Sequence, residues 1–264
     1  LNLVKELTPP RGDLHRTHAV YVQHALRCSR LGPAYKKYSL SVVQAALEMV
    51  ARQSTVHPLR EYLFDLDWDG EKRVDNWLCE YLGAANSPIV AKMGRWWLIS
   101  AVARALIPGW DCQVDYTLVL EGEQGCGKSS TLRILGGDWY LPGLEDLRNK
   151  DAYQDLRGRW IVELPELDAL KGQQITRTKS FLSKPVDVYR PSYGADSQQF
   201  PRQCVFCGTT NETSYLQDAT GARRFWPVRV NQLDRLGLQR DRDQLWAEAV
   251  YLFHCGAVWW PESG

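Results

Sequence analysis

Apolar residues recur at two different spacings along the chain, and the spacing changes near residue 110. Residues 1–110 carry apolar side chains at the three- and four-residue intervals of an amphipathic helix. We expect one helix from Ser39, a favourable N-cap, to the break at Pro58, and another from Pro88 to the break at Pro108. This pattern predicts a helical N-terminal domain over residues 1–110.

From Asp115 onward, short apolar segments alternate with amphipathic ones. We expect strands at residues 116–120, 159–162 and 204–207, and helices at residues 128–135 and 176–182. Because strands that alternate with helices form parallel sheets, the pattern predicts an α/β core over residues 111–235. A last amphipathic helix at residues 244–253 predicts a C-terminal helical segment over residues 236–264.

The composition supports a packed protein and narrows its partners. Of 264 residues, 44% are hydrophobic and 11 are tryptophan, so the chain can bury a sizeable core. The net charge of +1 argues against a uniformly basic surface, so any nucleic-acid-binding surface must be local. No apolar run is long enough to cross a bilayer, and we expect no membrane partner. The chain begins at Leu1 rather than Met, and we expect it to be part of a longer protein.

The cysteines do not have the spacing of a zinc site, and the aspartates of residues 65–70 do not complete a calcium-binding loop. The seven cysteines are scattered and odd in number, which indicates a reduced, cytoplasmic protein. Cys204 and Cys207 form a Cys-x-x-Cys pair without a second ligand pair, so we assign them to a buried strand. The segment 65–70 begins like a calcium-binding loop, but its twelfth position is Asn76 where such a loop needs Glu. We predict a structural turn there.

Residues 122–129 carry the strongest chemical signal. Gly-Glu-Gln-Gly-Cys-Gly-Lys-Ser matches G-x-x-x-x-G-K-[ST] and lies between an expected strand and an expected helix. In such a P-loop, glycines let backbone N–H groups face phosphate oxygens at the positive end of the helix. We expect Lys128 to contact the β- and γ-phosphates of ATP and Ser129 to bind Mg²⁺. The predicted nucleotide-binding residues are Gly122, Glu123, Gln124, Gly125, Cys126, Gly127, Lys128, Ser129 and Ser130.

Two glutamates follow the second expected strand. Acidic residues at the end of a buried strand suit a Mg²⁺ ligand and a base that activates water. We predict Glu163 as a Mg²⁺ ligand with Ser129, and we count both Glu163 and Glu166 as catalytic residues. The two glutamates are three positions apart, so the sequence leaves the division of roles between them open.

Three further polar residues are candidates for catalysis. Asn211 directly follows the third expected strand, where an amide can hold the attacking water; an ordinary turn asparagine is the alternative. Arg223 and Arg224 precede an aromatic pair. Either one is a candidate arginine finger that neutralises transition-state charge, and the alternative is a solvated charge patch.

Residues 179–194 mix basic and aromatic side chains with turn-forming residues. Such a loop can track a phosphate backbone and stack bases, while a surface hairpin is an equal alternative on composition alone. The candidate DNA-binding residues are Lys184, Arg190 and Tyr193. Arg190 could instead be a buried structural arginine near Asp187.

In their order along the chain, these motifs resemble the virulence-associated protein E family of phages and mobile elements. The resemblance covers residues 60–230 and rests on segments 68–70, 102–109, 122–129, 161–168, 189–194, 209–211 and 221–226. The family is similar to superfamily-three helicases, which are AAA+ ring ATPases. The resemblance therefore implies an AAA+ P-loop core, ATP hydrolysis at the interfaces of a hexameric ring, and a finger (Arg223 or Arg224) acting in trans. It also implies a hairpin with Lys184, Arg190 and Tyr193 that touches single-stranded DNA in a central channel.

The sequence thus favours an ATP-dependent DNA helicase or translocase that serves replication of a phage or mobile element in the cytoplasm of a bacterial host cell. One alternative is a nucleotide-switched oligomeric assembly or defence module that does not move along DNA. A second alternative is a small-molecule P-loop kinase. Two features argue against the kinase, namely the Arg223-Arg224 motif and the basic loop around Arg190.

Overall fold

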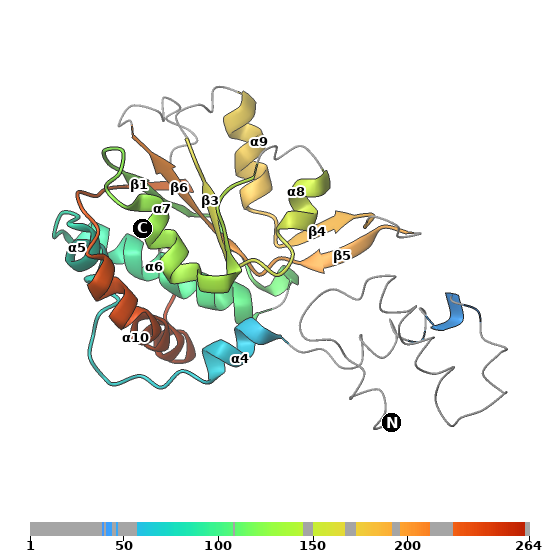
Figure 1. Cartoon of the computed structure of the whole chain (residues 1–264), viewed down its shortest axis with the longest axis horizontal. Helices are drawn as coiled ribbons and strands as arrows, with labels where there is room; N and C mark the ends of the chain where they lie inside the picture. Colours follow the sequence, from blue (N-terminus) through green and yellow to red (C-terminus); the bar gives the residue numbers. More distant parts are fainter. Residues whose placement is uncertain are drawn as a thin grey trace. The chain divides into compact units, whose positions relative to one another are not determined.

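The computed structural model describes residues 39, 41–43, 46, 57–107, 109–144, 150–166, 173–191, 196–211 and 224–261. Two compact units make up the chain, Leu1–His57 and Pro58–Gly264. In the first unit, residues 41–43 and 46 are helical, as expected for a helix after Ser39, and the rest of that helix lies outside the described residues. All the elements below belong to the second unit (Figure 1).

A parallel sheet of five strands lies at the centre of this unit, in the order β2-β3-β6-β1-β7. Its strands are β1 (Thr117–Glu121), β2 (Tyr140–Leu141), β3 (Ile161–Leu164), β6 (Val205–Thr210) and β7 (Phe225–Arg229). The three strands expected from the sequence correspond to β1, β3 and β6, while the edge strands β2 and β7 were not expected. Because all strands run the same way, the loops after β1, β3 and β6 meet at one edge of the sheet.

Both faces of the sheet are buried, which explains why its strands are continuous apolar runs rather than alternating ones. Leu118 and Leu120 of β1 belong to one core, which they share with Trp97. Val119, between them in sequence, belongs to a second core on the opposite face with Phe181. This alternation follows from the strand geometry, in which successive side chains point to opposite faces. The prediction of an α/β P-loop core with a parallel sheet is confirmed.

The helices agree in part with the expected ranges. They are α4 (Pro58–Phe64), α5 (Trp77–Leu82), α6 (Pro88–Leu106), α7 (Lys128–Gly136), α8 (Lys150–Asp155), α9 (Gln173–Leu182) and α10 (Arg235–His254). As expected, α6 begins after Ser87, whose hydroxyl accepts a hydrogen bond from the Val90 N–H at 3.4 Å. The last helix begins at Arg235, whereas the sequence pattern placed its start at Gln244.

Helices α4 to α6 share a core with the sheet. The Trp97 indole of α6 donates a 2.9 Å hydrogen bond to the Phe206 carbonyl of β6. In return, Trp160, which precedes β3, donates a 2.8 Å bond to the Ala101 carbonyl of α6. The compact units therefore divide at residue 57, whereas the sequence placed a boundary at 110. The hydrophobic pattern of the sequence changes at 110, but α6 packs against α10, α5 and α4 as well as against β1 and β6, and so belongs to the same compact unit as the sheet.

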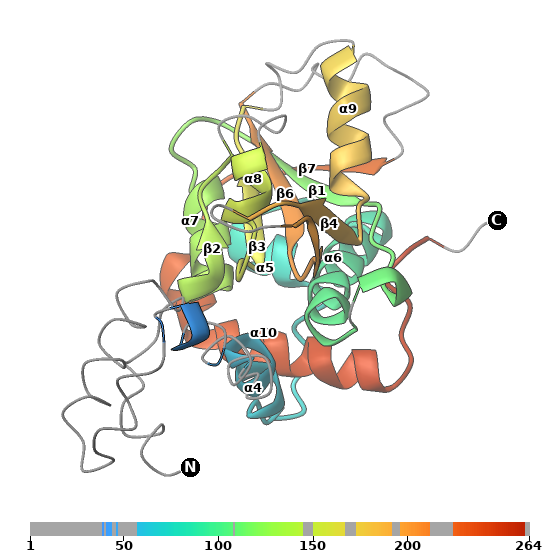
Figure 2. The same ribbon diagram turned by 90° about the vertical axis from the view of Figure 1, so that its right-hand side faces the viewer.

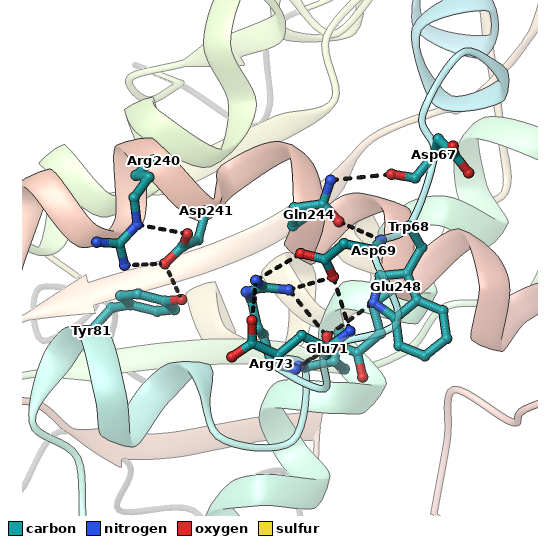
Figure 3. A network of polar contacts seen from close by, with 11 residues as sticks. Asp67, Trp68, Asp69, Glu71, Arg73, Tyr81, Arg240, Asp241, Gln244 and Glu248 are labelled. Atoms are coloured by element: carbon teal, nitrogen blue, oxygen red, sulfur yellow. Dashed lines mark hydrogen bonds and ion pairs between the residues drawn. The ribbon is translucent and has the colours of Figure 1, made fainter.

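A polar network fixes α10 against the loop between α4 and α5 (Figure 3). The buried Glu248 carboxylate accepts hydrogen bonds from the N–H groups of Arg73 and Val74, at 2.5 and 2.8 Å. Asp69 pairs with Arg73 and also accepts a bond from the Glu71 N–H, as expected for a structural turn. Figures 1 and 2 show α10 beside α4 and α6, and the network explains why it is held there.

Strands β4 (Val186–Tyr189) and β5 (Gln198–Pro201) pair as an antiparallel hairpin at the side of the sheet (Figure 1). A buried ion pair of 2.5 Å between Arg202 and Asp187 holds its base, and the Arg202 guanidinium also lies over the rings of Phe181 and Phe206. A hairpin was one of the two alternatives for residues 179–194, and β4 within that range is part of one. The partner of Asp187 is Arg202, and the alternative that placed a buried Arg190 there is wrong because Arg190 is exposed.

No helix in the described part of the chain is both long and apolar enough to span a membrane.

Candidate functional site

The P-loop connects β1 to α7 at the edge of the sheet where the parallel strands end. Gly125 and Gly127 have φ of +86° and +100°, a backbone conformation that favours glycine. At Gly127 there is a second constraint, because an added Cβ would lie 2.5 Å from the Cβ of Leu233. The Leu233 N–H also donates a 3.1 Å bond to the Cys126 carbonyl. The segment between β7 and α10 therefore packs directly on the loop and limits its shape.

Lys128 is buried, and its ammonium group lies among oxygen acceptors of the loop. Its Nζ donates to the carbonyls of Gly122 and Glu123 at 2.7 and 2.8 Å, and to Oδ1 of Asn211 at 3.0 Å. These bonds bring together two predicted site residues, Lys128 and Asn211, which are 83 positions apart. An incoming phosphate would compete with the two carbonyls for the same charged donor, since a bond between charged groups is stronger than one to a neutral carbonyl.

Glu163 is the most enclosed acid of the site, with 3% of its surface exposed. The hydroxyls of Ser129 and Thr209 each donate a 2.7 Å hydrogen bond to its Oε1, and the Tyr140 hydroxyl donates to its Oε2. Burial, and then the bond to Glu163, raises the pKa of Tyr140 well above its usual range, so this phenol remains a donor. Three hydroxyl donors therefore compensate the buried carboxylate.

Glu166 differs from Glu163 in its exposure, in its position relative to β3 and in its backbone conformation. It is exposed, follows Pro165 at the end of β3, and has a φ of +52°, which is uncommon for a residue other than glycine. Strained backbone of this kind is frequent at functional sites. One glutamate is thus fixed beside Ser129, while the other lies at the solvent side of the same cavity.

A cavity of about 310 Å³ joins these groups. Its lining comes from the P-loop and α7, from the end of β3, and from the end of β6. The predicted residues Gln124, Gly125, Gly127, Lys128, Ser129, Ser130, Glu163, Glu166 and Asn211 all contribute to it. Gly122 and Glu123 take part through their carbonyls, which hold Lys128, and Cys126 lies 3.7 Å from the same ammonium group.

The oxygen donors at Ser129 and Glu163 fit a magnesium ion. Mg²⁺ is bound by a few carboxylate or hydroxyl oxygens together with substrate phosphates, rather than by an all-protein cage. Here a hydroxyl and a carboxylate oxygen lie 2.7 Å apart at the start of α7. No cluster of three or more His, Cys, Asp or Glu side chains suited to a metal occurs among the described residues. A metal at this place would therefore need the oxygens of a bound phosphate.

Of the remaining predicted residues, those that the structure describes do not line this cavity. Arg224 donates a 3.3 Å hydrogen bond to the Lys179 carbonyl of α9, and Arg223 lies outside the described residues. Lys184 is half-buried, with its Nζ 3.1 Å from the Tyr153 hydroxyl and over the same ring. Arg190 is exposed at the end of β4, and Tyr193 lies outside the described residues.

Sequence reasoning missed Tyr140, Thr209 and Thr210, which line or support the site. The two threonines directly precede Asn211, and their position at the end of a strand was a usable signal. Tyr140 gave no such signal, because it reaches Glu163 only through the pairing of β2 with β3. The cysteine pair is part of the apolar interior, as expected, and burial raises the pKa of Cys204 to about 11.

Known structures and families give the following likenesses. Two apo structures of the C-terminal region of NrS-1 share the fold, each with a TM-score of 0.51, at 15% and 16% sequence identity. Each match covers 71% of this chain and 48% of the NrS-1 chain, so the chain spans about half the length of those structures. No functionally curated protein matches the sequence.

The family comparison is more specific. The family model described as the virulence-associated protein E-like domain matches residues 63–264. This range includes the P-loop, both glutamates, Asn211 and the whole of α10. It begins within α4, so it includes the whole of α5 and α6, which share a core with the sheet. The chain therefore belongs to the virulence-associated protein E-like domain family.

Proposed function

We propose that this domain binds and hydrolyses ATP with Mg²⁺ and works as an AAA+ motor on DNA in the replication of a phage or mobile element. The observation that carries the proposal is the meeting of Lys128, the Ser129–Glu163 pair and Asn211 in one cavity at the ends of β1, β3 and β6. A structural role alone does not explain an ammonium group, a buried carboxylate and an exposed amide at the same edge of the sheet.

Each group has a defined part in hydrolysis. Lys128 exchanges the Gly122 and Glu123 carbonyls for phosphate oxygens and neutralises their charge. Asn211, already bonded to Lys128, orients the attacking water next to the γ-phosphate. Glu166 takes the proton of that water as its oxygen bonds to phosphorus and the bond to the β-phosphate oxygen breaks. The products are ADP and phosphate.

Glu163 and Ser129 are the residues that would hold the magnesium ion. When bound, such an ion would offset the negative charge of the phosphate oxygens. The protein contributes a carboxylate whose position is fixed by Tyr140 and Thr209 before any ligand arrives. A fixed ligand loses little conformational freedom on binding, which favours a preformed site.

The DNA-directed part of the proposal rests on the order of motifs and on the hairpin. The β4–β5 hairpin carries Arg190 at its exposed end and lies beside α8, on the side of the sheet away from α5 (Figure 1). A hexameric ring, a finger from Arg223 or Arg224 in trans, and a location in the cytoplasm of a bacterial host all belong to this proposal. The alternative is a nucleotide-switched assembly that oligomerises with ATP but has no turnover stimulated by DNA.

The decisive experiment measures the ATPase rate with and without single-stranded DNA, together with the mass of the protein with nucleotide bound. We expect a magnesium-dependent rate that DNA stimulates and a mass several times that of one chain. Lys128→Ala should reduce turnover by orders of magnitude while the fold persists. If the protein binds ATP and oligomerises but DNA does not stimulate turnover, the nucleotide-switched assembly is supported. If ATP changes neither the mass nor any measured rate, both the motor and the switched assembly are refuted.

A further inference from the structure

A second cavity, of about 550 Å³, lies between the start of α7 and the first half of α10. Helix α7 contributes Ser129, Ser130, Arg133 and Ile134, and α10 contributes Arg235, Gln239 and Arg242. The first cavity, at the P-loop, has no lining residue from α10, and neither Arg133 nor Ile134 lines it. The second cavity is also the larger of the two, and its size is within the range of small-molecule sites.

The two cavities meet at Ser129 and Ser130, which line both. A single ligand could therefore extend from one cavity into the other past these two serines, and the orientation of a nucleotide at the P-loop determines which part enters which cavity. The γ-phosphate end of a nucleotide belongs near Asn211 and Glu166, because the residues that act on the attacking water are there. Backbone N–H groups of a P-loop cradle the α- and β-phosphates, so the α-phosphate end leaves the loop on the side of Ser130. The sugar and base, attached at that end, then face the second cavity.

The side chains of the second cavity suit a nucleoside. Guanidinium groups stack on planar aromatic rings and donate hydrogen bonds to oxygen, and three arginines line this cavity. Within the described residues, neither Arg133 nor Arg235 has an ion-pair partner. The Arg133 guanidinium lies 5.8 Å from the centroid of the Tyr140 ring, and this contact leaves its charge without an acidic partner. Gln239 offers a donor and an acceptor on one amide, which is the combination that the edge of a base requires. Ile134 adds an apolar contact.

One wall of the cavity is already rigid. Arg242 donates from Nε to the Leu135 carbonyl at 3.2 Å, pairs with Asp243 at 2.8 Å, and lies over the Tyr62 ring. Helix α10 itself is fixed by the Glu248 and Asp241 contacts of Figure 3. The wall is therefore organised before a ligand arrives, and this lowers the entropic cost of binding.

We propose that this arginine-lined cavity binds the sugar and base of the nucleoside triphosphate whose phosphates lie at the P-loop. The inference rests on the proposed nucleotide site and adds the residues that recognise the nucleoside. Arg133 provides a stacking surface, and Gln239 distinguishes one base from another by hydrogen bonding. Arg235 and Arg242 donate to oxygens at the α-phosphate and sugar end.

The test uses two ligands, one with a nucleoside attached to its three phosphates and one without. Calorimetry measures Kd for Mg-ATP and for Mg-tripolyphosphate, which has the phosphates but no nucleoside, on wild-type protein, Arg133→Ala, Gln239→Ala and Lys128→Ala. Arg240→Ala is the matched control, since Arg240 is an exposed arginine of the same helix that does not line the cavity. A melting curve for each variant confirms that it is folded.

We expect Arg133→Ala to weaken Mg-ATP binding about tenfold, equal to about 1.4 kcal/mol, with tripolyphosphate binding and the control unchanged. Gln239→Ala should also reduce the preference for ATP over GTP and CTP. If Arg133→Ala weakens the binding of both ligands equally, the cavity holds phosphate. If it weakens the binding of neither, the cavity holds no part of the nucleotide. Either result overturns the inference. If wild-type protein binds neither ligand, or Lys128→Ala binds both normally, the proposed phosphate site has failed, and the inference falls with it.

Discussion

The Ser129 hydroxyl donates a 2.7 Å hydrogen bond to Oε1 of Glu163, which places the first turn of α7 in direct contact with β3. The two residues are 34 positions apart, so the contact depends on the fold. It distinguishes the two glutamates, because Glu163 of β3 lies against the P-loop serine and Glu166, which follows the strand, does not. We therefore predict that substitutions which affect one glutamate or the other have separable effects.

Tyr140→Phe should reduce the affinity for magnesium without preventing nucleotide binding. The Tyr140 hydroxyl is the donor that holds Oε2 of Glu163, and the loss of a residue that orients a metal ligand typically costs about 10–100-fold in metal affinity. The measurement is the Mg²⁺ concentration for half-maximal ATPase activity. Tyr116→Phe, whose ring stacks on Trp226, is the control. An unchanged Mg²⁺ requirement in Tyr140→Phe would contradict the assignment.

Glu166→Gln should bind ATP normally and hydrolyse it about 10²–10⁴-fold more slowly, the usual contribution of a general base. The amide keeps the shape of the side chain but cannot accept the proton of the attacking water. Single-turnover hydrolysis separates this step from binding. Glu80→Gln, an exposed glutamate of α5, controls for the change in charge. Normal turnover in Glu166→Gln would exclude this residue as the base.

The two candidate finger residues should differ in effect. Arg224 already contacts the Lys179 carbonyl within its own chain, so we expect Arg223→Ala to cause the larger loss of turnover, about 10³–10⁵-fold. Mixing Arg223→Ala with Lys128→Ala should restore part of the activity, because mixed interfaces contain some intact sites. If mixed oligomers form and no activity returns, the site is contained in one chain.

Arg190 directly follows β4 and Lys184 lies just before it, and we expect Arg190→Ala and Lys184→Ala to act in different ways. Arg190 is exposed at the end of β4, so its loss should weaken single-stranded DNA binding and flatten the salt dependence, by a log–log slope of about 0.7 per phosphate contact. Lys184 packs on Tyr153, so its loss should also lower the melting temperature. Fluorescence anisotropy over a salt series and thermal melts measure the two effects. Unchanged DNA affinity in folded Arg190→Ala would exclude this end of the hairpin from the contact.

Asp241 should make part of the stability of the domain sensitive to acid. Its carboxylate accepts bonds from Arg240 and from the Tyr81 hydroxyl, and the Arg240 contact, the largest cause, lowers the pKa of Asp241 below its usual value. A lowered carboxyl pKa gives stability that is present above the unfolded pKa and is lost as pH falls through the folded one. Asp241→Asn should therefore melt about 2–4 °C lower at pH 7, for a loss of about 1 kcal/mol, and lose less than wild type on acidification to about pH 3.

The matched control for Asp241→Asn is Asp111→Asn, which removes an exposed carboxylate from the turn after α6. Melting curves at both pH values should be the same for this control and for the wild type. An equal drop on acidification in Asp241→Asn and in wild type would mean that Asp241 has no part in the acid sensitivity.

The sequence by itself determined the α/β class, the three central strands and the P-loop. These features are encoded locally, because a strand buried on both faces must be an apolar run and a phosphate loop needs its glycines at fixed spacing. Local encoding also explains why the start of α6 at Ser87 was predictable, whereas the edge strands β2 and β7, which lack a distinctive local pattern, were not.

Only the tertiary structure decided which polar groups meet. The pairing of β2 with β3 brings Tyr140 to Glu163, and the hairpin gives Asp187 the partner Arg202 in place of Arg190. The packing of α10 on α7 creates the arginine-lined cavity from residues more than a hundred positions apart. No sequence period specifies such contacts, because hydrogen bonds and ion pairs between distant residues depend on how whole elements pack, and that packing is set by the apolar cores on the two faces of the sheet.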